Sequence, residues 1–587
     1  MTPAEGEILL HDATAGWLHF REPCLILTAH RLAEVLPALH QAERLVERNG
    51  WYAAGFVSYE AAPAFDSALT TRSLDDDFPL LWLALYPVPA KLDALAPPAA
   101  PSRLGAWTPS IRREDYIDSI ARIKEHIASG RTYQVNYTLR LRTAFSGDAY
   151  ALFYDLVGAQ VSGYSAFVDT GRYAVCSASP ELFFERDGDL ISCRPMKGTI
   201  KRGRTLAEDQ AQARSLAGSE KDRAENVMIV DMVRNDLGRI AELGSVEVPS
   251  LFTEERYPTL WQLTSTVTAR SRVSFTDLIA ALFPCASITG APKISTMRII
   301  ADLETAPRRI YTGAIGFLSP GRKAQFNVAI RTALVDRQLG LAEYGVGGGI
   351  VWDSTPHGEY EEALLKARVL IERRPDFSLL ETLLWTHSDG IFLPDRHARR
   401  MADSATYFGI STTREQIEAH LGRLAADLAA SPSSDLGYAQ RIRLLLAHAG
   451  ALSHETSPLE APATKPLRVS LAAQPVNTSD VFLFHKTTHR AVYESARQPH
   501  PECDDVLLWN ERGELTEFTL GNLVLELDGE QITPPVECGL LPGTFREWLL
   551  ERGEVRERLI TRDDLSRCGR IYRVNSVKRW ETVILEA

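Results

Sequence analysis

Apolar residues recur at helical and at strand spacing through the first two thirds of the chain. Residues 114–129 carry isoleucines at every third or fourth position, the spacing of one helix face, and Gly130 can cap that helix. Strand-like alternation follows, and a glycine-rich pair of strands is expected at residues 310–318 and 324–335. This pattern predicts an α+β fold with long sheets flanked by helices.

The pattern breaks at residues 373–375, Arg-Arg-Pro, and restarts at Phe377. Helical spacing near residues 397–408 and 413–430 gives way to mainly strand-like segments up to Glu586. A chain of 587 residues is too long for one hydrophobic core. The sequence therefore predicts two domains, residues 1–372 and residues 377–587.

Charge and cysteine content narrow the class of protein. The formal net charge of −12 disfavours broad nucleic-acid binding, and no apolar run is long enough to cross a bilayer. The N-terminus is acidic and lacks the basic and apolar pattern of a signal peptide. Seven cysteines lie scattered without Cys-x-x-Cys spacing, which fits a reducing compartment. We expect a cytoplasmic enzyme that uses neither nucleic acid nor membrane as a partner.

Two lysines stand in contexts that differ from those of surface lysines. Lys197 lies between an apolar alternation and a Gly-Thr pair, and Lys486 lies in Phe-His-Lys-Thr-Thr nearly three hundred positions later. Partial burial removes the proton of a lysine amine and makes it a nucleophile. Two such amines predict two active sites.

Seven segments before the break form an ordered set of motifs. The set resembles the chorismate-utilising enzymes, a family that includes anthranilate, isochorismate, salicylate and aminodeoxychorismate synthases. The resemblance covers residues 1–372, is strongest from Ile111 onward, and implies a large chorismate-binding α/β sandwich. The segments are residues 130–136, 177–181, 195–199, 225–236, 287–293, 311–316 and 347–349.

Chorismate is a small dicarboxylate, so its site needs cations and backbone N–H donors. Arg331 and the open backbone at Gly347 and Gly349 can supply both. The resemblance implies that Thr289 and Tyr311 also contact the substrate.

Three glutamates complete the implied first site. The resemblance makes Glu181 a general acid that helps the ring hydroxyl leave, which requires a raised pKa. It also places Mg²⁺, a cation that prefers oxygen ligands, on Glu225 and Glu362. An ordinary solvated helix carboxylate is the alternative for Glu362, which lies in a Glu-Tyr-Glu-Glu run.

Lys197 separates the members of the family. Anthranilate synthases carry alanine at the matching position, whereas aminodeoxychorismate synthases carry lysine. In the latter, the resemblance implies covalent attack of the amine on the ring, followed by displacement by ammonia at the conjugated position. Isochorismate-forming relatives also carry a lysine, which acts as a base toward water. Lysine at position 197 therefore argues against anthranilate chemistry more strongly than against isochorismate chemistry.

Four segments after the break resemble the fold-type IV pyridoxal-phosphate enzymes, which include aminotransferases and aminodeoxychorismate lyase. The resemblance implies a pyridoxal 5'-phosphate (PLP) domain of two lobes. It does not by itself separate a lyase from an aminotransferase. The segments are residues 393–401, 484–488, 514–523 and 541–546.

The implied PLP site has a residue for each end of the cofactor. Lys486 would hold the cofactor as a Schiff base and move the substrate proton, and Glu517 would pair with the pyridine nitrogen. Arg400 would bind the phosphate, together with backbone groups near Asn522 and Thr544. For Arg400 a helix-surface position is the alternative, although His-x-x-Arg places both residues on one helix face.

The fusion of the two halves resembles bifunctional aminodeoxychorismate synthase component I/lyase enzymes. It implies amination of chorismate, then loss of pyruvate to give 4-aminobenzoate for folate synthesis. No Gly-x-Cys-x-Gly glutaminase motif occurs, so ammonia is expected from a separate glutamine amidotransferase subunit. Fold-type IV relatives commonly dimerise, so a homodimer through the PLP domain is a further expectation. The alternatives are an anthranilate or isochorismate synthase fused to an aminotransferase, a C-terminal half that only dimerises, and an inactive scaffold.

Overall fold

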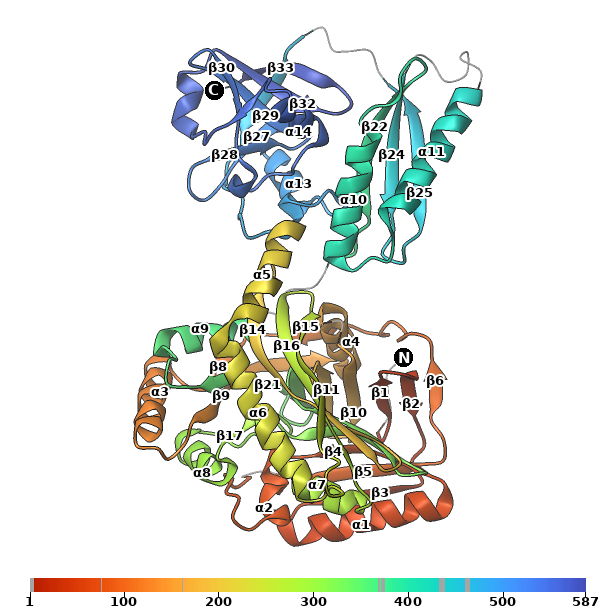
Figure 1. Ribbon diagram of the computed structural model, residues 1–587, viewed down its shortest axis with the longest axis vertical. Helices are drawn as coiled ribbons and strands as arrows, with labels where there is room; N and C mark the ends of the chain where they lie inside the picture. Colours follow the sequence, from red (N-terminus) through yellow and green to blue (C-terminus); the bar gives the residue numbers. More distant parts are fainter. Residues whose placement is uncertain are drawn as a thin grey trace. The chain divides into compact units, whose positions relative to one another are not determined.

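The chain folds into two compact units in this computed structural model (Figure 1). The first unit comprises Met1–Lys201 with Ala213–Arg374, and the second comprises Pro375–Ala587 with Arg202–Gln212. The structure describes residues 5–74, 77–160, 162–367, 370, 375–431, 439–459 and 465–586. The expected domain boundary at residue 372 and the break at residues 373–374 lie outside the described residues, so the domain ranges stay a prediction.

The first unit contains two large antiparallel sheets. One has the spatial order β17 (Gly290–Ala291), β9 (Gln134–Gly147), β21 (Leu341–Ile350), β20 (Thr332–Asp336), β11 (Tyr173–Ser179), β10 (Tyr164–Asp169), β1 (Ile8–Asp12), β2 (Gly16–Phe20) and β6 (Ala90–Leu92). The other has the order β14 (Met196–Lys201), β16 (Leu260–Arg270), β13 (Leu190–Arg194), β12 (Leu182–Asp187), β19 (Lys323–Val328), β18 (Ala314–Ser319), β4 (Tyr52–Val57), β5 (Leu81–Tyr86) and β3 (Leu25–Ala29).

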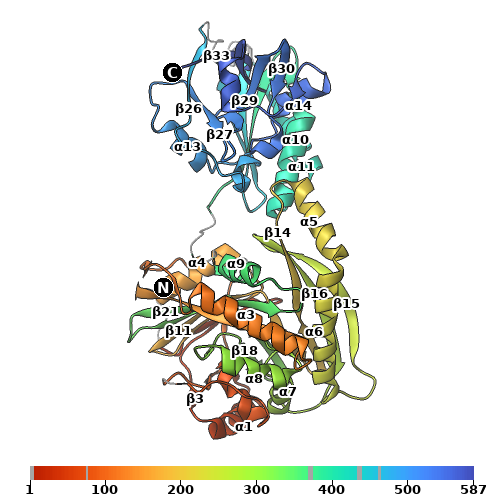
Figure 2. The same cartoon turned by 90° about the vertical axis from the view of Figure 1, so that its left-hand side faces the viewer.

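The two sheets pack face to face over one apolar layer, which includes Phe20 from the first sheet and Phe56 and Ile315 from the second. Helices cover the outer faces. On the first sheet lie α3 (Arg113–Ala128), α4 (Ala149–Gln160), α8 (Lys293–Leu303) and α9 (Pro356–Ala367), and on the second lie α1 (Leu32–Asn49), α6 (Glu220–Gly238) and α7 (Phe275–Leu282). Helices α3 and α9 lie side by side, and α6 lies along β14 and β16 (Figure 2). The predicted α/β sandwich is confirmed.

One predicted strand is wrong. Residues 324–335 read as a single strand, but the structure divides them into β19 and β20, which belong to different sheets. The division falls at Arg331, whose φ of 49° lies in the left-handed region and turns the chain. The segment that carries Arg331 therefore crosses from one sheet of the sandwich to the other.

The second unit has two lobes, as expected. In the first lobe the sheet β23 (Gly390–Ile391), β22 (Leu379–Thr386), β24 (Ala439–Leu446), β25 (Leu452–Pro458) packs against α10 (Pro394–Phe408) and α11 (Arg414–Ala430). The second lobe contains β28 (Leu515–Phe518), β27 (Asp505–Trp509), β26 (Leu467–Leu471), β33 (Arg579–Leu585), β32 (Arg570–Asn575), β29 (Gly521–Leu527), β30 (Glu530–Thr533) and β31 (Arg556–Glu557), with α13 (Ala491–Arg497) and α14 (Thr544–Glu551).

A short excursion of the chain between β14 and α6 belongs to the second unit. The guanidinium of Arg202 lies 4.3 Å from the centre of the Tyr407 ring, and the Tyr407 hydroxyl donates to the Gly203 carbonyl at 2.8 Å. His485, next to the predicted cofactor lysine, contacts the Arg204 carbonyl at 3.0 Å through Nε2. Residues 202–204 lie just before the helix α5 (Leu206–Gly218).

The structure also bears on membrane-spanning helices and on the cysteines. In the described part of the chain, no helix is long and apolar enough to cross a bilayer. All seven cysteines are free thiols.

Candidate active sites

Lys197 lies in a bulge of strand β14. The register with β16 shifts between Met196 and Thr199, and Gly198 inside the bulge has a φ of 86°, which only glycine adopts without strain. Burial lowers the pKa of Lys197, the nearby Lys366 lowers it further, and Glu225 and Glu181 oppose the shift. The strand thus holds an amine that loses its proton more readily than a free lysine.

Glu181 lies immediately before β12 and is almost fully buried. Ser287 Oγ donates to its Oε1 at 2.5 Å. Burial raises the pKa of Glu181 to about 7, while Ser287 and Lys197 oppose the rise. A carboxyl group with this pKa can donate a proton near neutral pH, as the predicted general acid must.

Glu225 on α6 and Glu362 on α9 interact electrostatically with Lys197, and Glu359 on α9 interacts with both of these glutamates. On α6, burial raises the pKa of Glu225, and Lys197 opposes the rise. On α9, burial raises the pKa of Glu359, which accepts a hydrogen bond from Ser354 Oγ at 2.6 Å. Glu362 differs, because Lys366 Nζ lies 2.9 Å from its Oε1 and lowers its pKa.

The predicted substrate contacts fall into two groups. Gly347 and Gly349 lie on β21 beside the acids: the Gly347 carbonyl accepts from Lys366 Nζ at 3.0 Å, and a Cβ on Gly349 would lie 3.0 Å from Lys197 Nζ. Thr289, Tyr311 and Arg331 are joined to Lys197 by no hydrogen bond or ion pair within the described residues.

Thr289 and Tyr311 are buried, Arg331 is half-buried, and each has its own neighbours. Thr289 Oγ1 donates to the carbonyls of Cys285 and Ala286 at 3.2 and 3.1 Å. The Tyr311 ring lies under the Arg140 guanidinium at 5.1 Å, and burial raises its pKa to about 12. The structure thus brings the predicted acids and Gly349 together around Lys197, and among the described residues it shows no direct bond from Lys197 to the other three predicted contacts.

The guanidinium of Arg331 is half-buried. It donates to Gln160 Oε1, lies 5.7 Å from the centre of the Tyr257 ring, and has its pKa lowered by burial. A partly buried cation of this kind is suited to a carboxylate of the substrate.

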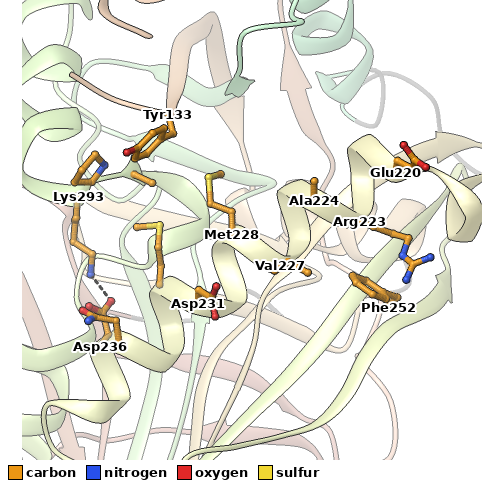
Figure 3. A pocket seen from close by; sticks show the side chains of 14 residues that line it. Tyr133, Glu220, Arg223, Ala224, Val227, Met228, Asp231, Asp236, Phe252 and Lys293 are labelled. Carbon is orange, nitrogen blue, oxygen red and sulfur yellow. Dashed lines mark hydrogen bonds and ion pairs between the residues drawn. The ribbon is translucent and has the colours of Figure 1, made fainter. Parts of the chain in front are cut away.

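A separate groove of about 900 Å³ runs along the outer side of α6. None of the predicted site residues lines it, although Glu225 lies on the same helix. In Figure 3 the side chains of Lys293 and Asp236 point toward one another within it, and Lys293 Nζ lies 2.7 Å from Asp236 Oδ2. Other side chains of the groove include Tyr133, Val227, Met228, Met232 and Phe252.

In the second unit, Glu517 is buried and Lys486 is half-buried. Burial lowers the pKa of Lys486 to about 8, with a further contribution from Arg400. Burial raises the pKa of Glu517 to about 7. The Glu517 carboxylate accepts hydrogen bonds from Tyr493 Oη at 2.9 Å, from the Leu541 amide at 3.1 Å and from Asn522 Nδ2 at 3.2 Å.

Arg400 and Thr544 lie at the junction of the two lobes. Arg400 makes a two-pronged ion pair with Glu381, at 2.8 and 2.6 Å, and donates to the Pro542 carbonyl at 3.0 Å. Although burial opposes it, Arg400 and His397 together lower the pKa of Glu381 to about 2. His397 links the set to the start of α14, since its Nε2 lies 3.2 Å from Thr544 Oγ1.

Comparison with known proteins decides the family. A family model of the chorismate binding enzymes matches residues 7–372, more than half of the chain. The chain belongs to this family. A second model, amino-transferase class IV, matches residues 378–583. The predicted resemblance to both families is thereby confirmed for this chorismate-binding enzyme.

Two named relatives each match less than half of the chain. Aminodeoxychorismate synthase component 1 of Salmonella typhimurium is 42% identical over 279 residues, which are 47% of this chain and 61% of that protein. Anthranilate synthase component 1 1 of Haloarcula marismortui is 40% identical over 261 residues, 44% of this chain and 53% of that protein. This chain thus spans about three fifths or less of either relative.

Among solved structures, anthranilate synthase component I of Streptococcus pneumoniae TIGR4 has a TM-score of 0.52 and 23% identity, over 63% of this chain and 94% of that one. This likeness shows the fold of the first unit.

Chorismate-binding enzymes use Mg²⁺, and the acids of the first site fit that ion. Glu225 and Glu359 are carboxylates whose charge is disfavoured by burial, and a divalent cation would relieve that cost. Glu362, which interacts with Glu359, would supply a third oxygen donor. Among the described residues no three acids, histidines or cysteines already converge as a preformed metal cluster.

Class IV aminotransferases use PLP, and the second site fits it. Lys486 is an amine of lowered pKa for the Schiff base, and Glu517 is a buried carboxyl for the pyridine nitrogen. The Arg400 cation and the first turn of α14 fit a phosphate group. A Cβ on Gly543, the residue before α14, would lie 1.8 Å from Asn522 Oδ1, so position 543 has no room for a side chain.

Several residues around the two sites went unnoticed in the sequence. Glu359 and Lys366 have the spacing of charged residues on an ordinary exposed helix face. Ser287 lies in a recognised motif, but its hydroxyl group was given no role. In the second site the unnoticed residues are Glu381 and Tyr493, which bind Arg400 and Glu517 from distant segments.

Proposed function

We propose that this enzyme aminates chorismate to 4-amino-4-deoxychorismate and then removes pyruvate from it to give 4-aminobenzoate for folate synthesis. The observation that carries the proposal is the lysine at position 197, with a lowered pKa and with Glu181 and Glu225 beside it. Anthranilate synthases carry alanine at the matching position. The name of the Salmonella relative, aminodeoxychorismate synthase component 1, supports the same activity.

In the first reaction Lys197 and Glu181 act together. The neutral Lys197 amine forms a bond to the ring while the ring hydroxyl leaves with the Glu181 proton as water. Ammonia then adds at the conjugated position, and the bond to Lys197 breaks, with its electron pair returning to the lysine nitrogen. Glu225, Glu359 and Glu362 would hold Mg²⁺, which supplies a charge that binds a substrate carboxylate.

In the second reaction the cofactor supplies an electron sink when it is bound. Lys486, with a pKa near 8, holds and moves the proton taken from the ring carbon. Glu517 faces the pyridine end, and Arg400 and the first turn of α14 hold the phosphate. Aromatisation of the ring accompanies the loss of enolpyruvate.

Ammonia is proposed to come from a separate glutaminase subunit. The name of the Salmonella relative, a component 1, supports a second component. We also propose a cytoplasmic location and a homodimer formed through the PLP domain, as the sequence predicts.

The test is a reaction of the purified chain with chorismate, Mg²⁺ and ammonium, without glutaminase, followed by mass analysis of the products. We expect 4-aminobenzoate from the PLP-loaded protein, and aminodeoxychorismate alone from Lys486→Ala. Formation of anthranilate or isochorismate, or a requirement for a keto acid, would contradict the assignment. Lys197→Ala should lose ammonium-dependent turnover and serves as the matched negative variant.

A further inference from the structure

A short piece from the first half of the sequence is built into the second unit. The inserted segment (residues 202–212) groups with the two PLP lobes rather than with the strand β14 that precedes it. The proposed chemistry gives this segment no role. Two of its contacts are with His485, the residue directly before Lys486, and with Tyr407 on α10.

His485 is buried, and its hydrogen bonds define which ring nitrogen carries the proton. Burial lowers the pKa of His485 to about 4, so the ring is neutral at neutral pH. Its Nε2 lies 3.0 Å from the Arg204 carbonyl, which can only accept, so Nε2 carries the proton. Nδ1 is then an acceptor, and Ser404 Oγ donates to it at 2.9 Å. The ring therefore joins the inserted segment to α10 through both of its nitrogens.

The inserted segment is held in a tight turn where it meets His485. The Asp209 carboxylate accepts from Arg202 Nε at 2.6 Å and from the Gly203 amide at 3.0 Å. The side chains of Arg202 and Asp209 are 7% and 2% exposed. A Cβ on Gly203 would lie 2.2 Å from the Asp209 amide nitrogen, so the turn closes tightly. Arg202 Nη2 also donates to the Tyr407 carbonyl at 2.8 Å, which fixes the turn on α10.

Helix α10 also carries the predicted phosphate ligand. Arg400 and Tyr407 are seven residues apart, which places them on one face of the helix, two turns apart. Arg400 contributes to the lowered pKa of Lys486, so the two cations lie near each other. The Lys486 carbonyl accepts from the Leu380 amide of β22 at 2.9 Å. Strand β22 thus holds the backbone after Lys486, and the ring of His485 holds the backbone before it.

We propose that residues 202–204 and His485 are positioning residues of the PLP site, which hold Lys486 in place relative to Arg400. Binding of PLP needs both groups at once, the lysine amine at one end of the cofactor and the guanidinium at its phosphate. A site whose two anchors are already in place loses less conformational freedom when the ligand binds. The inference rests on the part of the proposed function in which the second unit binds PLP.

The test is a PLP titration of the full-length variant His485→Phe, followed by the absorbance of the bound cofactor. Phenylalanine keeps a flat ring against Tyr407 and Phe408, whose ring centres lie 4.3 and 4.8 Å from that of His485. It leaves the Arg204 carbonyl and the Ser404 hydroxyl without their partner. We expect the Kd for PLP to rise about tenfold or more. The KM for chorismate in the first reaction should change less than about threefold.

Two further variants separate positioning from packing. His485→Gln keeps an N–H donor for the Arg204 carbonyl, so its Kd for PLP should stay within about threefold of the unmodified value. Arg202→Gln removes the cation from the Tyr407 ring, and its Kd should rise about fivefold or more. His387→Phe is the matched control, because His387 is exposed in the turn after β22. It should leave the Kd unchanged.

The failures are distinguishable. An unchanged Kd in both His485→Phe and Arg202→Gln would overturn the proposal. An equal loss of affinity in His485→Gln and His485→Phe would also overturn it, because the bond to the inserted segment would then not matter. If His485→Phe does not fold, Tyr407→Phe, which removes the hydroxyl that donates to the Gly203 carbonyl, should raise the Kd in its place. Failure of the unmodified protein to bind PLP would instead overturn the proposed second reaction.

Discussion

Adding one methyl group at Gly349 should disable the first site and leave the second intact. The new Cβ would lie 2.1 Å from Gln134 Nε2 and 3.0 Å from Lys197 Nζ. Ordinary contacts between such atoms begin near 3.5 Å. The amide must therefore retreat by more than 1 Å, and the lysine amine by about half as much.

The expected loss follows from that displacement. A misplacement of about 1 Å between reacting groups costs up to about 100-fold in rate, equivalent to about 2.7 kcal/mol of activation free energy. We expect the ammonium-dependent kcat/KM of Gly349→Ala to fall about 100-fold. Conversion of supplied aminodeoxychorismate to 4-aminobenzoate should stay unchanged, because Lys486 belongs to the other unit.

Gly158→Ala is the matched control, since Gly158 lies in α4 and a Cβ there would meet nothing within 4 Å. It should leave both activities unchanged, and alanine in a helix should raise stability slightly. Retention of more than about half the kcat/KM by Gly349→Ala would refute the reasoning that the side chains of Gln134 and Lys197 need the space that a glycine leaves at position 349. A thermal melt of each variant separates a local effect from loss of the fold.

Further predictions concern protonation and the cofactors. Because Glu181 must be protonated and its pKa is about 7, kcat/KM of the first reaction should fall as pH rises above about 7, and Glu181→Gln should remove most activity. Lys486→Ala should lose the pyridoxal absorption band of the Schiff base and accumulate aminodeoxychorismate; an intact band would contradict its role. Glu381→Ala removes the ion pair that holds the Arg400 guanidinium in place. It should therefore weaken PLP binding about tenfold or more in a cofactor titration. EDTA should abolish only the first reaction.

Local patterns were enough to predict the elements and the motif residues, but not their partners. The isoleucine spacing at residues 114–129 predicted α3, which the structure places at Arg113–Ala128. The division of residues 324–335 between two sheets depends on one left-handed residue, Arg331, and nothing in the alternation of apolar residues marks it. Strand pairing across two hundred positions, as between β9 and β21, is likewise set by the whole core.

The same reason explains which site residues were found. Lys197 stands in a local sequence that is unusual for a lysine, so it could be recognised alone, whereas Glu181 was recognised only through the family motif that contains it. Ser287 becomes informative only because its hydroxyl meets Glu181, and Tyr493 only because it meets Glu517. The Lys366–Glu362 ion pair has the i,i+4 spacing that is common on exposed helix faces. The spacing alone therefore does not indicate that the pair lies beside the Lys197 amine.

The two sites share one electrostatic arrangement. Each pairs a lysine whose pKa is lowered by burial with a buried glutamate whose pKa is raised to about 7, Lys197 with Glu181 and Lys486 with Glu517. Desolvation disfavours both charged forms at once, so it shifts each lysine toward its neutral amine and each glutamate toward its protonated form. In the first site that state is what nucleophilic attack with departure of a hydroxyl requires. In the second, hydrogen bonds from Tyr493 and the Leu541 amide oppose the rise of the Glu517 pKa, which favours the carboxylate form that can pair with a cation.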